Sequence, residues 1–138
     1  MAVTAILLLA ALPSVAAEHP AYLRALSDLR AARWLIEHRP GNWKQTVDEV
    51  EAVRAIDAAI NEIKRAAIDD GKDLRDHPPV QEVNERVGRL RKALELLKKT
   101  RGDVNKEEDN NFAQGLKIRA LRHIDEAIGL TERAIATK

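Results

Sequence analysis

Apolar residues recur at alternating spacings of three and four along most of the chain, and prolines and glycines interrupt the pattern at three places. An α-helix has about 3.6 residues per turn, so this spacing gathers the apolar side chains on one face. The repeat is cleanest from Val80 to Leu97, where only valine and leucine occupy its positions. Because a stripe of this kind has to be covered by another element, the pattern predicts an all-α protein of packed helices.

The interruptions divide the repeat into four expected helices. Pro20 suits the first helical position, because the N–H that proline lacks has no partner there. Residues 39–42, residues 71–79 and Gly102 form the three breaks, since proline and glycine readily end helices. The expected helices cover about residues 20–38, 43–70, 80–101 and 105–136.

Short connections favour antiparallel packing of helices that follow one another in the chain. The expected architecture is therefore all-α, an up-down-up-down antiparallel four-helix bundle formed by residues 18–138. The first helix is the shortest in this scheme, which would leave one end of the bundle partly open. We expect that end near His19, residues 71–79 and the end of the fourth helix, with Asp76 or His77 capping the third helix.

The composition agrees with a helical bundle and excludes several classes of function. Hydrophobic residues make up 45% and charged residues 33% of the chain, and its 23 basic and 22 acidic residues are interleaved. This balance produces no strong field that would attract nucleic acid. Cysteine is absent, which excludes disulfides, thiol catalysis and iron–sulfur clusters. The chain also lacks a phosphate-binding loop and a serine-nucleophile motif, so we expect no enzyme.

The first residues have the properties of an export signal. An apolar run from Ala5 to Leu12 is followed by Pro13 and small residues, and Val15-Ala16-Ala17 fits the small-x-small pattern of signal peptidase. The run is shorter than the roughly 20 apolar residues that span a membrane. We therefore expect residues 1–17 to be a cleaved signal peptide, the mature protein to be periplasmic or secreted, and no membrane span to remain.

Histidines are the candidate metal ligands. His123 lies on or beside the apolar face of the fourth expected helix, about 28 Å from its start, and the first helix is expected to begin at a similar depth. His19 would then come close to His123. Two imidazoles and a carboxylate can bind Zn, Cu or Ni. The alternative for His123 is a half-buried imidazole hydrogen-bonded to a neighbouring group. The nearest polar groups on the other helices are expected to be Asp57 or Asn61 and Glu82 or Glu85.

Other residues invite structural explanations. His38, at the end of the first helix, is expected to interact with the helix C-terminus. Trp34 and Trp43 flank the first break and are expected to cover one end of the core. Gly88, Gly115 and Gly129 fall inside expected helices, where close packing, a bend or a small groove would account for them.

Two stretches, HPAYLRALSDLRAARWLI (residues 19–36) and AAIDDGKDLRDHPPV (residues 66–80), resemble small exported bacterial helical-bundle proteins. The resemblance implies the bundle fold and carries no activity and no site residues. The sequence thus favours a non-enzymatic binding or interaction protein, monomeric or dimeric, whose partner is a protein or a small ligand. The alternative is a periplasmic Zn, Cu or Ni protein that uses His19 and His123, and we expect no other cofactor.

Overall fold

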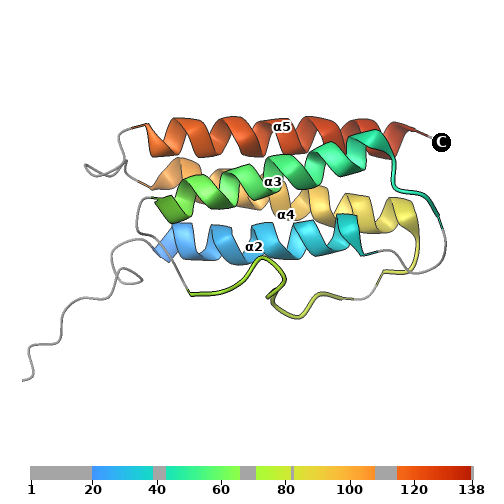
Figure 1. Ribbon diagram of the computed structural model, residues 1–138, viewed down its shortest axis with the longest axis horizontal. Coiled ribbons are helices and arrows are strands. Elements are labelled where there is room, and N and C mark those ends of the chain that lie inside the picture. The colour runs from blue at the N-terminus through green and yellow to red at the C-terminus, as the bar shows by residue number, and fades with distance from the viewer. Residues whose placement is uncertain (1–19, 39–42, 66–70, 82, 108–114, 138) are drawn as a thin grey trace, which may run out of the picture.

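The computed structural model describes residues 20–38, 43–65, 71–81, 83–107 and 115–137. Helices account for most of these residues, and no strand occurs among them. The expected all-α four-helix bundle is confirmed, whereas the predicted signal peptide, residues 1–17, lies outside the described residues. The helices are α2 (Pro20–Glu37), α3 (Val47–Arg65), α4 (Arg86–Lys106) and α5 (Leu116–Ala136), as Figure 1 shows.

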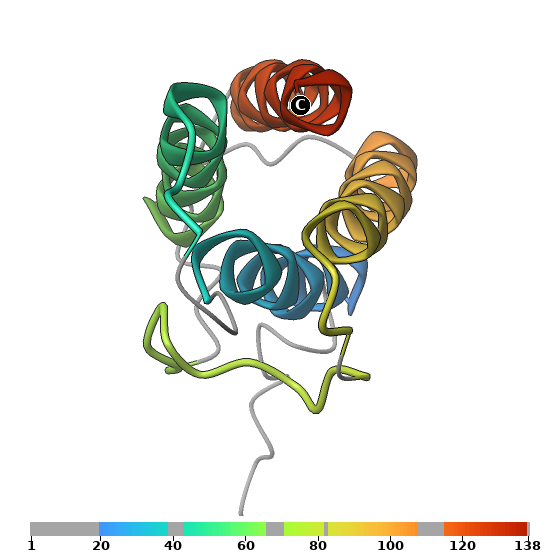
Figure 2. The same cartoon turned by 90° about the vertical axis from the view of Figure 1, so that its right-hand side faces the viewer.

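Each helix packs against two others, and the four surround a common core in the order α2, α3, α5, α4 (Figure 2). Arg86, at the start of α4, contacts both Glu49 at the start of α3 and the carbonyl oxygen of Ala134 near the end of α5. At the other end, the Ala21 N–H at the start of α2 donates to the Glu107 carboxylate, which follows α4. These contacts make every packed pair of helices antiparallel.

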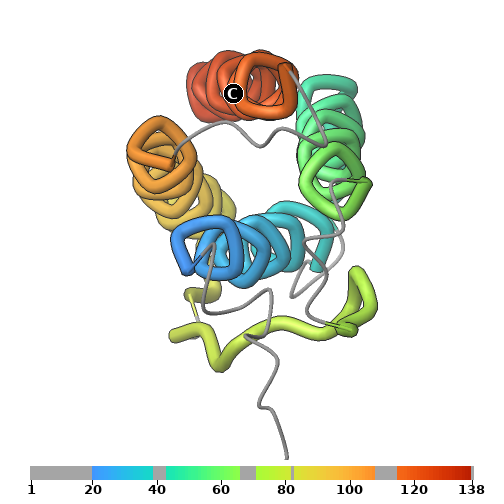
Figure 3. Tube along the Cα trace, turned by 90° about the vertical axis from the view of Figure 1, so that its left-hand side faces the viewer, coloured from blue at the N-terminus to red at the C-terminus, as the bar shows by residue number. Residues whose placement is uncertain are grey.

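The connection between α3 and α4 departs from the expected up-down-up-down order. These two helices run in the same direction on opposite corners of the bundle and do not pack against each other (Figures 2 and 3), although the Arg86 and Glu49 side chains pair where both helices begin. The observed order is therefore up-down-down-up. The chain after α3 has to return along the whole bundle before α4 can begin. This distance is about 28 Å for the 19 residues of α3.

Residues 71–81, which we call the strap, belong to this return path and lie along the outer side of α2 (Figure 1). Pro78 and Pro79 fix their own backbone and disfavour helix in the residue before each of them. The return path also takes up the residues after Pro79, so the third helix begins at Arg86 instead of Val80, and Glu85 occupies its N-cap position. The expectation that Asp76 or His77 caps this helix is wrong. The buried residues of α4 are Arg89, Leu90, Ala93, Leu97, Thr100 and Val104.

The boundary between the last two helices also differs from the expected one. Gly102 lies inside α4, and α5 begins at Leu116, after Gly115 in a left-handed conformation with φ of 82°. The four helices have 18, 19, 21 and 21 residues. The first helix is thus nearly as long as the others, and the strap covers a side of the bundle instead of an end. None of the described helices combines the length and apolar character that a membrane span needs.

Two helical glycines differ in their surroundings, although the sequence places both inside expected helices. A methyl group added at Gly88 in α4 would lie 2.7 Å from a methyl of Val83, whereas one added at Gly129 in α5 would meet no atom within 4 Å. Close packing therefore explains Gly88. Gly129 lies in open space, and its helix has no steric need for glycine.

This difference predicts opposite effects of the same substitution. We expect Gly129→Ala to raise the free energy of unfolding by about 0.5 to 1 kcal/mol, because alanine restricts the unfolded chain and favours helix. Gly88→Ala should lower it by about 1 kcal/mol, because Val83 has to move away from α4. Urea denaturation followed by circular dichroism measures both values. A stabilising Gly88→Ala would mean that Val83 yields without cost.

Candidate functional site

The structure describes only part of the expected metal site. His19 lies outside the described residues. His123 is half-buried on α5, with Nδ1 4.0 Å from a carboxylate oxygen of Glu126. Because α5 begins at Leu116, His123 lies about 10 Å from the start of its helix and not at the expected depth. Binding of Zn, Cu or Ni by His19 and His123 stays a prediction.

The two carboxylates expected near these histidines, Asp57 and Glu85, lie in other surroundings. Asp57 on α3 accepts a hydrogen bond of 2.7 Å from Nε of Arg33 on α2. Glu85 precedes α4, at the end of the bundle where α5 finishes, far along the axis from His123. Within the described ranges, no group of three or more histidine and carboxylate side chains is arranged to hold a metal ion.

The structure instead gathers two other histidines around Trp34. The ring of His38 stacks on Trp34 with centroids 4.7 Å apart, and the ring of His77 stacks on it at 4.8 Å. The guanidinium carbon of Arg89 lies 4.7 Å from the same indole centroid, a distance at which a cation is attracted to the ring. This cluster joins α2, the strap and α4. His77 therefore anchors the strap instead of capping a helix.

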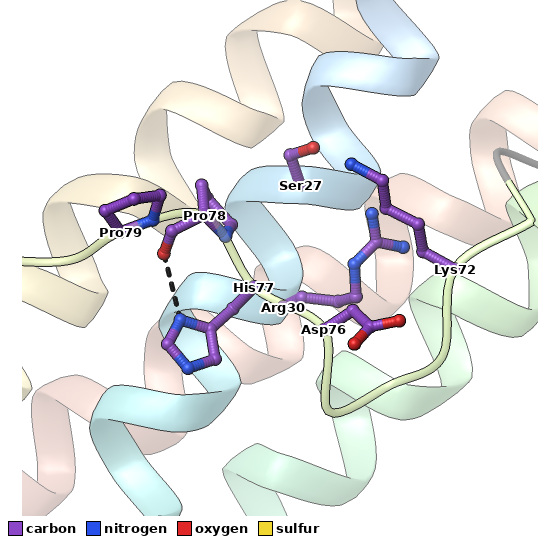
Figure 4. Close-up of a pocket in the computed structure, with 7 residues that line it drawn as sticks. All are labelled: Ser27, Arg30, Lys72, Asp76, His77, Pro78 and Pro79. Atoms are coloured by element: carbon purple, nitrogen blue, oxygen red, sulfur yellow. Dashed lines mark hydrogen bonds between the residues drawn. The ribbon is translucent and has the colours of Figure 1, made fainter.

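Two pockets, which together we call the strap cleft, lie between α2 and the strap. Each has a volume of about 390 Å³, and His77 contributes to the wall of both. The first pocket, drawn in Figure 4, is lined by Ser27, Arg30, Lys72, Asp76, His77, Pro78 and Pro79. The second is lined by Arg33, Trp34, Glu37, His38, Leu74, Arg75 and His77.

The second pocket has an aromatic wall and a fixed cation. Arg33 is held by its hydrogen bond to Asp57 and by an ion pair with Glu37, one turn further along α2. Burial alone would lower the pKa of Arg33, but the hydrogen bond and charge of Asp57, followed by those of Glu37, raise it above its ordinary value. The two carboxylates therefore favour the charged form of Arg33 and set its position.

The first pocket has a buried cation in its wall. Arg30 is only 1% exposed, although it lies on the side of α2 that faces away from the bundle core. The strap covers this side, which explains why 10 of the 18 residues of α2 are buried. Figure 4 shows the Arg30 guanidinium, the Lys72 ammonium and the Ser27 hydroxyl directed toward the same part of the pocket, with the Asp76 carboxylate on its other side.

Glu62 on α3 and Arg119 on α5 form an ion pair away from the strap cleft. Nε of Arg119 donates to a Glu62 oxygen at 2.9 Å, and the Glu62 side chain is 12% exposed. This hydrogen bond lowers the pKa of Glu62 below its ordinary value of 4.5, and the charges of Arg119, Arg65 and His123 add to it against the opposing effect of burial. The pair ties α3 to α5 at the end where α5 begins.

The lowered pKa makes this stabilisation depend on pH. A carboxyl whose pKa is lower in the folded protein stabilises the fold above its unfolded pKa, and loses that effect as the pH falls through the folded value. We expect wild type to be more stable than Glu62→Gln by a constant amount above about pH 5, and the gap to narrow below about pH 4. Urea titrations across this range measure it. Glu95→Gln, at an exposed position, is the control, and a gap that stays constant to low pH would contradict the prediction.

Sequence reasoning missed the strap cleft for two reasons. It placed His77 at a helix cap, and it judged α2 by a single apolar stripe. One signal was available: Ala31 and Ala32 directly follow Arg30, so small apolar residues continue around α2 beyond that stripe, which is typical of a helix covered on more than one side. The strap, which covers the side of α2 that carries Arg30, is 40 or more residues away in the sequence, as the numbers of Arg30 and Asp76 show.

Comparison of the chain with protein-family models, with curated proteins and with solved structures finds no match.

Proposed function

We propose that this protein is a non-enzymatic binding protein that takes a small ligand in the strap cleft. The observation that carries the proposal is that α2 and the strap enclose two adjoining pockets of about 390 Å³ each. Ligand pockets commonly have volumes of roughly 300 to 1,000 Å³ and combine apolar walls with a few polar groups. The strap cleft has this composition, with Trp34, Leu74 and two prolines beside charged side chains.

The arrangement of Ser27, His77 and Asp76 favours binding over hydrolysis. These are the residue types of a catalytic triad, and all three line the first pocket. Nδ1 of His77, however, lies 2.9 Å from the carbonyl oxygen of Pro78, and the Asp76 carboxylate accepts from the backbone N–H of Asp73. The His77 ring is also directed away from Ser27 (Figure 4). A triad needs the serine bonded to the histidine and the histidine bonded to the acid.

The proposal includes action outside the cytoplasm, in the periplasm or after secretion. It is supported by the apolar run from Ala5 to Leu12 and by the small residues Val15-Ala16-Ala17, and by the resemblance to small exported bacterial helical bundles. The intact mass of protein recovered from the periplasm tests this part. A mature chain that begins at Glu18 is expected, and a chain that retains Met1 would contradict export by cleavage.

Native mass spectrometry of the full chain purified from the periplasm tests the binding proposal. We expect a fraction of the protein to carry a small molecule. Ser27→Phe, which fills the first pocket, should abolish that added mass, whereas Arg54→Ala, at a side chain 74% exposed on α3, should retain it. An unliganded wild type that also shows no chemical-shift change at the strap with a panel of metabolites would overturn the proposal. So would an added mass that Ser27→Phe leaves unchanged.

A further inference from the structure

We infer that the first pocket of the strap cleft is an oxyanion subsite, which takes the carboxylate or phosphate group of a small organic ligand. The inference rests on the proposed function and specifies its ligand. Three donors from two elements meet in this pocket: Ser27 and Arg30 on α2, and Lys72 on the strap (Figure 4). An oxyanion accepts several hydrogen bonds at once, and bonds from charged donors are the strongest of these.

Arg30 gives the subsite a cation whose position is set before a ligand arrives. It is 1% exposed and is carried by the middle of α2, so its side chain has little freedom left to lose. A guanidinium also presents its N–H groups in a planar fork that matches the oxygens of a carboxylate or phosphate. Ordering a donor in advance lowers the entropic cost of binding.

Lys72 supplies the second cation from the opposite wall. It lies on the exposed strap, and its carbonyl oxygen accepts a 2.7 Å hydrogen bond from Nζ of Lys64 on α3. That bond holds the strap backbone at this point, while the Lys72 side chain reaches into the pocket. A guanidinium held in place and an ammonium on a flexible stem together suit a group with oxygens on more than one side.

The charge in the pocket also favours an anion. Arg30 and Lys72 carry two positive charges, and Asp76 carries one negative charge. The Asp76 carboxylate accepts from the backbone N–H of Asp73 at 3.1 Å, so a bond within the strap turn already uses one of its oxygens. The rest of the ligand would extend past His77 to the second pocket, where Trp34 and Leu74 offer an apolar wall.

Titration of the full chain with benzoate and with phenyl phosphate, followed by amide chemical shifts, tests the inference. The two probes share an aromatic ring and differ in the oxyanion. Their relative affinities therefore show whether the subsite prefers a carboxylate or a phosphate. We expect shifts at the strap and α2, a dissociation constant that rises with salt, and at least tenfold weaker binding in Lys72→Gln. Lys98→Gln, at an exposed position on α4, should bind as wild type does.

A substitution that tightens binding of the probes distinguishes recognition of an anion from a loss of structure, because damage to the fold would only weaken binding. Asp76→Asn keeps an oxygen that can accept from Asp73 and removes the negative charge that Asp76 brings to the pocket, so binding of either probe should become about threefold to tenfold tighter. Arg30→Lys should weaken binding while the amide spectrum shows a folded bundle. Probes that bind equally well to wild type, Lys72→Gln and Asp76→Asn would overturn the inference, and so would the absence of binding by both probes. A neutral metabolite bound in the cleft would then leave the proposed function standing.

Discussion

Replacing Arg89 by methionine is expected to lower the free energy of unfolding by about 3 kcal/mol. The Arg89 side chain is 1% exposed, and its guanidinium donates to the carbonyl oxygens of Leu35 at 3.2 Å and of Val83 at 2.9 Å. Leu35 lies in the last turn of α2, where carbonyl groups have no partner within the helix. Methionine has a similar length and no donor, so it would leave both carbonyls without these bonds and remove the cation beside Trp34.

The control is Arg91→Met on the exposed side of the same helix, which should change stability by less than about 0.5 kcal/mol. Both variants are measured by urea denaturation, with fluorescence of Trp34 as a second probe in a Trp43→Phe background. Because Arg89 also holds the segment that precedes α4, the Arg89 variant should lose protection of strap amides against hydrogen exchange. Equal stability of the two variants would show that the buried Arg89 side chain and its hydrogen bonds contribute nothing to the free energy of unfolding.

The second large effect is expected from Glu49→Ala, which should cost about 2 to 3 kcal/mol. Glu49 is 1% exposed and closes a capping box at the start of α3. Its carboxylate accepts from the Thr46 N–H at 2.5 Å, while the Glu49 N–H donates to the Thr46 hydroxyl at 3.2 Å. The same carboxylate lies 3.3 Å from Nε of Arg86. Nη2 of Arg86 donates to the carbonyl oxygen of Ala134 near the end of α5.

Loss of Glu49 would therefore loosen three helix ends that meet at one place. Glu51→Ala is the matched control, because the Glu51 side chain is 41% exposed and, among the described residues, pairs with Arg54 one turn further along. Its cost should stay below about 0.5 kcal/mol. A double-mutant cycle with Arg86→Ala should give a coupling of about 1 kcal/mol or more. Additive effects of the two substitutions would contradict a shared network.

Local signals in the sequence were sufficient where a helix starts or packs through its own periodicity. Pro20 marks the start of α2, and Tyr22, Leu29 and Ile36, which the alternating spacing of three and four places on one face of this helix, are buried. The same holds for Ala127 and Leu130 on α5. Burial at such positions follows from the spacing of apolar residues along one helix, which can be read directly from the sequence.

The same signals failed where the tertiary arrangement or a weak local preference decided a helix boundary. The repeat predicts helix from Val80, but the chain is still on its return path there, and α4 begins at Arg86. Gly102 predicts a helix end, yet a single glycine costs only about 1 kcal/mol inside a helix, and α4 continues through it. The depth of His123 along its helix also differs from the expected one, because α5 begins at Leu116; metal binding by His19 and His123 stays a prediction.

The sequence by itself determined four amphipathic helices and the face that most of them bury, because periodicity is a property of neighbouring residues. Only the tertiary structure decided that α3 and α4 run in the same direction on opposite corners, since that depends on which helix faces pack best together. The return path imposed by this order lays the strap over α2. It brings Arg30 and Trp34 against Lys72 and His77, and no local pattern connects residues so far apart in the chain.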